Sequence, residues 1–191
     1  MESIVDLNEL FIDMLHDIYY AEKKILKALP KMCKALEKGS QLTAAFEKHY
    51  EETIGQVERL DQVFEIIGEK PKAKKCDAIE GISQEADDLM EEVEDKAVLE
   101  AGLLAGAQAV EHYEMARYGT LIEWAKVLGY NEAAKLLHET LQEEKKTDQL
   151  LNKLAVSEIN RRAAESAKTS QDEDGGEREK TSRSASRRHA A

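Results

Sequence analysis

Glutamate occurs inside the apolar stripe of four separate predicted helices, and this feature constrains the fold more than any other. In the first helix, apolar residues recur at helical spacing: Leu7, Phe11, Leu15, Ile18, Ile25, Leu29, Cys33 and Leu36. At about 100° per residue, Glu22 falls at the centre of that stripe. A lone buried carboxylate is destabilising by several kcal/mol unless it is protonated, paired or bound to a cation. Four such residues at matching depth predict a metal site inside a helical bundle.

The composition favours a soluble all-α protein. The chain has 191 residues, of which 42% are hydrophobic and 35% charged, with only two prolines. This length suffices for one domain with a core, and few segments alternate strictly, so we expect no strands. The net charge of −12 argues against broad nucleic-acid or anionic-membrane binding by the main domain and suits a protein that attracts cations.

Two further observations suggest a cytoplasmic protein. The N-terminal segment is acidic and amphipathic, unlike a signal peptide, and no apolar run approaches the roughly 20 residues of a membrane span. Cys33 and Cys76 form neither a disulfide framework nor a CxxC pair. We expect Cys33 to be a buried, inert thiol, whereas a reactive role for Cys76 has no support in the sequence.

Four long helices and one short helix are expected. The long helices span about residues 4–37, 42–67, 94–128 and 131–164, and the short one spans about residues 78–92. Gly39 and Ser40 suit the first turn as helix stop and N-cap, Asn131 suits the N-cap of the last helix, and Pro30 could kink the first. Two tight hairpins joined by one long crossover match the ferritin-like arrangement of a four-helix bundle.

The chain is expected to divide at about residue 165. Residues 1–165 would form the bundle, whereas residues 166–191 have almost no apolar content and should form a disordered, low-complexity tail. The tail ends in a basic stretch, so a solvated tail and an arm that touches a partner or nucleic acid remain alternatives. The basic residues Lys70–Lys75 of the crossover are expected to form a solvated loop.

Acidic and amide side chains on the other three long helices supply further candidate metal ligands. These candidates are Glu52 and Gln56 on the second helix, Glu111 and Glu114 on the third, and Glu144 and Asp148 on the fourth. Counted from the two turns at 1.5 Å per residue, the carboxylates of each hairpin lie within roughly one or two turns in height. All four helices therefore bring a glutamate close to the middle of the bundle.

Converging carboxylates cannot all stay ionised in a dry interior without cations. Oxygen-rich ligand sets suit Mn, Fe, Mg or Ca, and two divalent ions would balance four or more acidic groups. Mutual protonation, or pairing with a buried Lys or Arg, is the competing solution. We find no Lys or Arg on these stripes near that depth.

Several segments, in order over about residues 4–160, resemble the YciE/YciF-type bacterial ferritin-like stress proteins. They are residues 17–23, 49–53, 56–60, 75–81, 110–114, 118–121, 133–137, 139–141 and 143–145. The resemblance implies a ferritin-like fold, a di-metal centre, a homodimer and induction under general or osmotic stress. It implies no established reaction.

The wider ferritin-like superfamily implies roles for single residues. Its di-iron bundles take one Glu from each of two helices and a Glu-x-x-His from each of the other two. Glu22 and Glu111 fit the single-Glu roles, and Glu111 with Glu114 also resembles the Glu-x-x-Glu of rubrerythrins. Glu52 and Glu144 fit the paired helices and would bridge two ions.

The histidines of that pattern are absent, because Gly55 and Thr147 stand where they would fall. Gln56, Asp148 and His49 are the possible substitutes. A site built from carboxylates and a carboxamide is harder than an imidazole site, so we expect either a preference for Mn or weak metal binding, and no fast oxygen activation.

Two functions remain open at this point. The first is a di-metal-binding stress-response protein that oxidises Fe(II) or removes peroxide at a di-iron or di-manganese site, with Tyr118 either a core residue or a redox-active neighbour. The second is a non-enzymatic dimer that acts through protein or RNA partners, with metal structural or absent. Bulk iron storage is a third, more distant possibility. His16, His112 and His138 point off the carboxylate stripes and are expected at the surface or flank.

Overall fold

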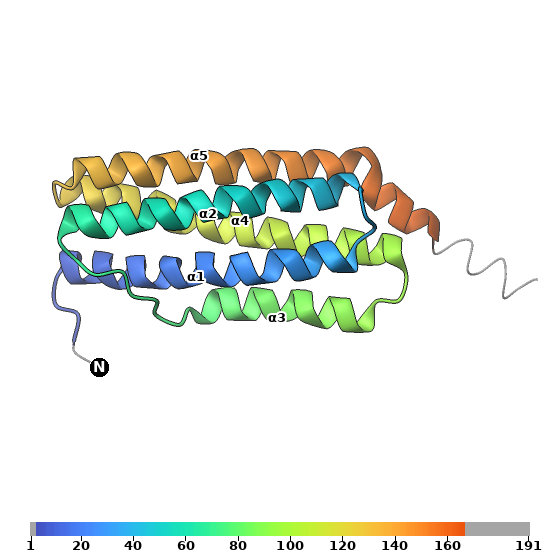
Figure 1. Cartoon of the computed structure of the whole chain (residues 1–191), viewed down its shortest axis with the longest axis horizontal. Coiled ribbons are helices and arrows are strands. Elements are labelled where there is room, and N and C mark those ends of the chain that lie inside the picture. The colour runs from blue at the N-terminus through green and yellow to red at the C-terminus, as the bar shows by residue number, and fades with distance from the viewer. Residues whose placement is uncertain (1–2, 167–191) are drawn as a thin grey trace, which may run out of the picture.

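Four long helices pack side by side, and a fifth, shorter helix lies along their outside (Figure 1). The computed structural model describes residues 3–166. Its elements are α1 (Leu7–Ala35), α2 (Gln41–Ile67), α3 (Asp77–Glu92), α4 (Lys96–Val127), α5 (Asn131–Leu154) and a π-helical turn, η1 (Ala155–Ile159). The described residues contain no strand, so the predicted all-α bundle with a helix in its long crossover is confirmed.

Local sequence signals set most helix ends. The Ser40 hydroxyl accepts a hydrogen bond from the backbone N–H of Thr43 at 3.1 Å, which confirms the predicted N-cap of α2. Asp6 caps α1 in the same way, accepting from the N–H of Glu9 at 2.8 Å, so α1 begins at residue 7 rather than residue 4. Gly68 ends α2 with a φ of 75°, a left-handed backbone conformation that is unfavourable for residues with a Cβ.

One expectation for the last helix is wrong. Asn131 does not cap α5: it is the first helical residue, the N-cap is Tyr130, and no side chain caps this end. The expected helical extent of about residues 131–164 is confirmed, although the hydrogen bonding within it is not uniform. Its hydrogen bonding changes at η1, after which residues 160–166 continue as α-helix. A π-helical turn places one extra residue in the helix, which rotates everything beyond it.

The two helical hairpins, α1–α2 and α4–α5, pack so that α2 lies against α5 and α1 against α4. In Figure 1, α1, α3 and α5 run in one direction and α2 and α4 in the other, as a ferritin-like crossover requires. The core between them is built from large apolar side chains such as Phe11, Leu15, Phe46, Leu60 and Leu103. Among the described residues, no helix combines the length and the apolar character needed to span a bilayer.

Helix α3 covers the groove between α1 and α4. The Glu80 carboxylate accepts from the Tyr20 hydroxyl and pairs with Lys24, both at 2.8 Å. Cys76, a buried free thiol, caps the start of α3 and lies 3.0 Å from the Tyr113 hydroxyl. The basic loop before it is exposed, as expected, and Lys74 pairs with Asp13 at 2.6 Å.

Candidate metal centre

Four buried side chains from three helices converge in the middle of the bundle. They are His49 of α2, Glu111 and Glu114 of α4, and Glu144 of α5. One ligand atom from each lies within 4.8 Å of the others, close enough for all four to contact one ion. Three of these residues, Glu111, Glu114 and Glu144, are among the ligands that the sequence nominates.

Helical spacing explains why α4 contributes two glutamates. Ala107, Glu111, Glu114 and Tyr118 are separated by four, three and four residues and are all buried. This spacing places them on one face of the helix. The face meets α1, which carries Glu22, and α5, which carries Glu144.

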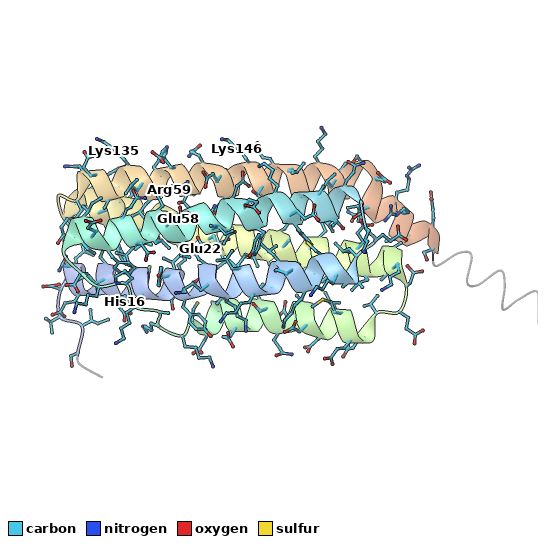
Figure 2. All side chains as sticks on the ribbon, viewed as in Figure 1. His16, Glu22, Glu58, Arg59, Lys135 and Lys146 are labelled. Atoms are coloured by element: carbon cyan, nitrogen blue, oxygen red, sulfur yellow. The ribbon has the colours of Figure 1, made fainter. Side chains whose placement is uncertain are left out.

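Glu22 approaches the cluster from α1. It is fully buried, and Figure 2 shows it between the helices, whereas Lys135 and Lys146 point outward from α5. The Tyr118 hydroxyl donates a hydrogen bond to one oxygen of Glu22, and the Glu114 carboxyl lies within hydrogen-bonding reach of Glu22. The sequence left Tyr118 open between a core role and a role beside the metal, and the fold places it in contact with a candidate ligand.

The four glutamates at the centre of the bundle lie in two neighbouring pairs, Glu22 with Glu114 and Glu111 with Glu144. Both oxygens of Glu114 and of Glu144, and one oxygen each of Glu22 and Glu111, have no hydrogen-bond donor. Two carboxylates cannot donate to each other, so only protonation or a bound cation satisfies these atoms. Such orphaned, inward-facing oxygens are the first argument that the cluster fits a cation.

Without a cation, the pKa values of these carboxyls rise. Burial raises the pKa of Glu22 to about 7, although the hydrogen bond from Tyr118 opposes the shift. Burial and the neighbouring acids raise the pKa of Glu111 to about 8. For Glu114 and Glu144, burial, followed by repulsion from the other glutamates, raises the pKa well above the ordinary value. The metal-free site therefore holds protons near neutral pH that a cation would displace.

His49 supplies the nitrogen ligand. Burial lowers its pKa to about 4, so the ring is neutral at pH 7 and has a lone pair to donate. Its Nε2 lies 3.3 Å from Glu111 Oε1, within the distance of an ion pair but without hydrogen-bond geometry, and neither ring nitrogen has a hydrogen-bond partner. A neutral, unpartnered imidazole facing three carboxyls is the second argument for a cation.

A basic side chain does lie near this depth, contrary to expectation. Arg59 of α2 is mostly buried and forms two hydrogen bonds to Glu143, at 2.9 and 3.1 Å, and one to Thr140 at 2.6 Å. Its positive charge lowers the pKa of Glu22, though by less than burial raises it. Because the guanidinium is already bound bidentately by Glu143, it does not neutralise the central cluster.

The remaining nominated ligands lie outside the group of four. Glu52 is partly exposed and its carboxylate is held by Lys48 at 2.5 Å. Gln56 is fully buried, but its Nε2 donates to Glu143 at 3.2 Å while its Oε1 has no partner. Asp148 is partly exposed and lies 3.2 Å from the exposed ring of His112.

The direction of the side chains on α2 explains why His49, and not Glu52, lies in the central cluster. The buried positions of this helix include Phe46, His49, Thr53, Gln56 and Leu60, at alternating spacings of three and four. Glu52 precedes Thr53 by one residue and is therefore rotated about 100° from that face. The signal for His49 was present in its spacing of seven residues from Gln56.

Comparisons with known proteins agree with this fold. A family model described as a domain of unknown function, DUF892, matches residues 6–164. Protein YciF of Escherichia coli K12 is 48% identical over 162 residues, which is 84% of this chain and 97% of YciF.

Solved structures agree as well. The crystal structure of the E. coli stress protein YciF has a TM-score of 0.78 at 47% identity and covers 82% of this chain and 99% of its own. YcfI from Rhodopseudomonas palustris has a TM-score of 0.77 at 48% identity, covering 79% and 96%. A protein from Xanthomonas campestris, at 21% identity and a TM-score of 0.67 over 85% and 99% of the two chains, shares the fold.

Proposed function

The chain belongs to the DUF892 family, and from that premise we propose that it binds two divalent metal ions, Fe or Mn, as a stress-response protein. One observation carries the proposal: ligand atoms of His49, Glu111, Glu114 and Glu144, all buried, lie within 4.8 Å of one another. The stress-response role rests on the similarity to YciF, which is described as a stress protein.

Charge balance supports two ions. Glu22, Glu111, Glu114 and Glu144 carry four negative charges when ionised, and two divalent cations neutralise them. The two carboxyl pairs suggest how the ligands divide, with Glu114 and Glu144 central, Glu22 on one side, and Glu111 with His49 on the other. Gln56 Oε1, which is buried and has no hydrogen-bond partner, is a further candidate from α2, while Glu52 and Asp148 would need to leave Lys48 and His112.

The donor set favours Fe or Mn over Mg or Ca. Imidazole nitrogen mixed with carboxylate oxygen suits Mn and Fe, whereas Mg and Ca take oxygen alone. Zinc prefers a tetrahedral site richer in nitrogen or sulfur. The four central glutamates, with His49 as their one nitrogen donor, do not form such a site. When bound, the ions would supply one-electron redox chemistry suited to oxidising Fe(II) or removing peroxide.

The protein's own residues would position and insulate that centre. Tyr118 holds the Glu22 carboxylate in one orientation through its hydroxyl. Arg59 is fixed by Glu143 and lowers the pKa of Glu22, which helps that carboxyl lose its proton to a cation. The candidate ligands are themselves buried, with exposed fractions between 0% and 4%, which limits the access of water to the centre.

Metal titration of two matched variants tests the proposal. Glu144→Gln removes a buried ligand charge, and Glu132→Gln makes the same change at an exposed position of the same helix. Anaerobic calorimetric titration with Fe(II) and with Mn(II) should show two sites per chain in wild type and Glu132→Gln. In Glu144→Gln, at least one site should weaken by 100-fold or more, about 2.7 kcal/mol. Unchanged stoichiometry and affinity in Glu144→Gln would contradict the assignment.

A homodimer, a cytoplasmic location and a weak nucleic-acid contact through the C-terminal segment stay predictions. Residues 167–191, which carry the predicted tail and its basic end, lie outside the described residues. Light scattering tests the dimer, and salt-dependent RNA binding by the full chain, lost on deletion of the predicted tail, residues 166–191, would favour the non-enzymatic alternative.

A further inference from the structure

A small cavity lies beside the metal ligands, under helix α3. Ile25 and Leu29 of α1, Ile82 of α3 and Val110 of α4 line it. His49 and Glu111 also line it. The cavity therefore touches two members of the central cluster, on the side that α3 covers.

The walls of this cavity are almost entirely apolar. The cavity has a volume of about 30 Å³ and is partly open toward solvent. Beyond the two candidate ligands, Ser83 is the only lining side chain with a polar atom. Walls this apolar offer a water molecule few of the two to four polar partners that it needs, and they suit an apolar guest.

Packing between α3 and α4 explains why the space exists. At Gly102 a Cβ would come within 3.2 Å of Leu89 Cδ1, so the two helices are in close contact there. One turn further along the same face, a Cβ at Gly106 would meet no atom within 4 Å. Small residues in the facing wall, Ala28, Ser83 and Ala86, leave this opening unfilled.

We infer that this cavity binds a small, uncharged, apolar molecule of the size class of dioxygen and presents it to the metal centre. The role beside the metal rests on the proposed function, but the binding itself does not. A polar oxidant such as hydrogen peroxide would lose its hydrogen bonds to water on entering and regain few from these walls. The cavity therefore favours dioxygen over hydrogen peroxide as the oxidant that reaches the metal centre.

Xenon, an apolar probe of similar size, tests the binding in the full-length, metal-free protein. Under xenon pressure, methyl NMR signals of Ile25, Leu29, Ile82 and Val110 should shift saturably. Methyl signals of Leu15 and Leu60, which are buried elsewhere, should shift much less. The absence of saturable shifts, or equal shifts at all buried methyl groups, would overturn the inference.

Two glycine variants of α4 sharpen this test. Gly106→Leu places a side chain in the cavity, whereas Gly119→Leu makes the same change where a Cβ also meets no atom, away from the cavity lining. Both replacements raise helix propensity, so both chains should fold. Xenon affinity should fall at least tenfold in Gly106→Leu and stay unchanged in Gly119→Leu. A folded Gly106→Leu chain with wild-type affinity would contradict the inference, and the wild-type methyl shifts decide the question if that chain does not fold.

Metal content, measured on the same three proteins, separates this inference from the proposed function. Xenon binding in a chain that rejects Fe and Mn would support the cavity and contradict the metal site. Metal binding without xenon binding would support the metal site and contradict the cavity.

Discussion

Helix α4 buries acidic side chains in two places, and the protein satisfies them in different ways. Near the start of the helix, buried Glu100 is paired with Arg162, which also lies 3.5 Å from Glu158. In the middle, Glu111 and Glu114 are equally buried but form no ion pair with Lys or Arg within residues 3–166. The same helix thus carries one carboxylate with a cation from the chain and two without.

Glu100 is held as a structural acid, whereas the central glutamates lack a counter-charge from the chain. Arg162 follows η1, whose extra residue rotates the end of the helix, so the chain has arranged its own counter-charge for Glu100. The central glutamates have no such arrangement, and their raised pKa values record the cost of burial without a partner. Buried carboxylates without a counter-charge from the chain are expected at a site that takes up cations from solution. A buried carboxylate with a structural role has such a counter-charge, as Glu100 does.

The largest expected effect is stabilisation of the central region by metal. Mn(II) at 1,000 times its dissociation constant should raise the free energy of unfolding of metal-free protein by about 4 kcal/mol. Urea unfolding with and without Mn(II) measures this, with Glu144→Gln as the variant that should respond much less, because its weakened site gives only about 1.4 kcal/mol at the same Mn(II) concentration. An unchanged urea midpoint in wild type would show that the central glutamates, like Glu100, receive no cation from solution.

The next effect concerns the Glu100 pair. Arg162→Met should lower the free energy of unfolding by about 2 kcal/mol, because it leaves Glu100 buried without its partner. The effect stays below the usual range for a buried pair because the Arg162 side chain is 40% exposed. Arg161→Met, at the exposed neighbouring position, is the control and should change stability little. Equal stability of the two variants would show that Glu100 needs no counter-charge.

A smaller effect is the pH dependence of the metal-free protein. The pKa values of Glu22 and Glu111 are raised to about 7 and about 8, so between pH 6.5 and 8 the folded chain holds protons that the unfolded chain has lost. The stability present at low pH is therefore lost as pH rises through this window, by about 1–2 kcal/mol. The depressed pKa of His49, about 4, acts only below pH 6.5 and in the opposite direction.

Denaturant unfolding at pH 6.5 and pH 8 measures this slope. Glu114→Gln should reduce it, because one of the coupled acids no longer ionises, whereas Glu123→Gln at an exposed position of α4 should not. Metal-loaded protein should show little of this slope, since bound metal displaces the protons that the metal-free fold holds. Greater stability of the metal-free protein at pH 8 would contradict the account.

The smallest effect concerns Tyr118. Tyr118→Phe removes the hydroxyl that donates to Glu22, so the pKa of Glu22 should rise above about 7 and the protein should lose about 1 kcal/mol of stability. Carboxyl-carbon NMR titration follows the pKa directly. Tyr130→Phe, whose hydroxyl bonds Asn8 at 3.0 Å far along the chain, is the control.

Helical periodicity predicted the bundle and the inward direction of Glu22, Glu111 and Glu144, because each sits at the centre of a long apolar stripe. Glu52 lies at the edge of its stripe, where a rotation of one residue decides between the interior and Lys48. Periodicity cannot resolve that choice, and it missed Arg59, whose contacts to Glu143 depend on how α2 meets α5.

The cavity could not be predicted from the sequence either. It depends on where α3 packs across α1 and α4, and hence on a contact between Leu89 and Gly102 that no local pattern encodes. The N-cap at Ser40 was predictable because its partner, Thr43, is three residues away. Local signals predicted the elements, whereas contacts between elements completed the site.

Metal content of the native protein tests the central claim most directly. Untagged full-length protein, produced with Fe and Mn both available and purified without chelator, should contain about two equivalents of Fe or Mn per chain by elemental analysis. Folded protein that carries neither metal, and that rejects both ions on titration, would contradict the claim that the central glutamates of α4 await a cation.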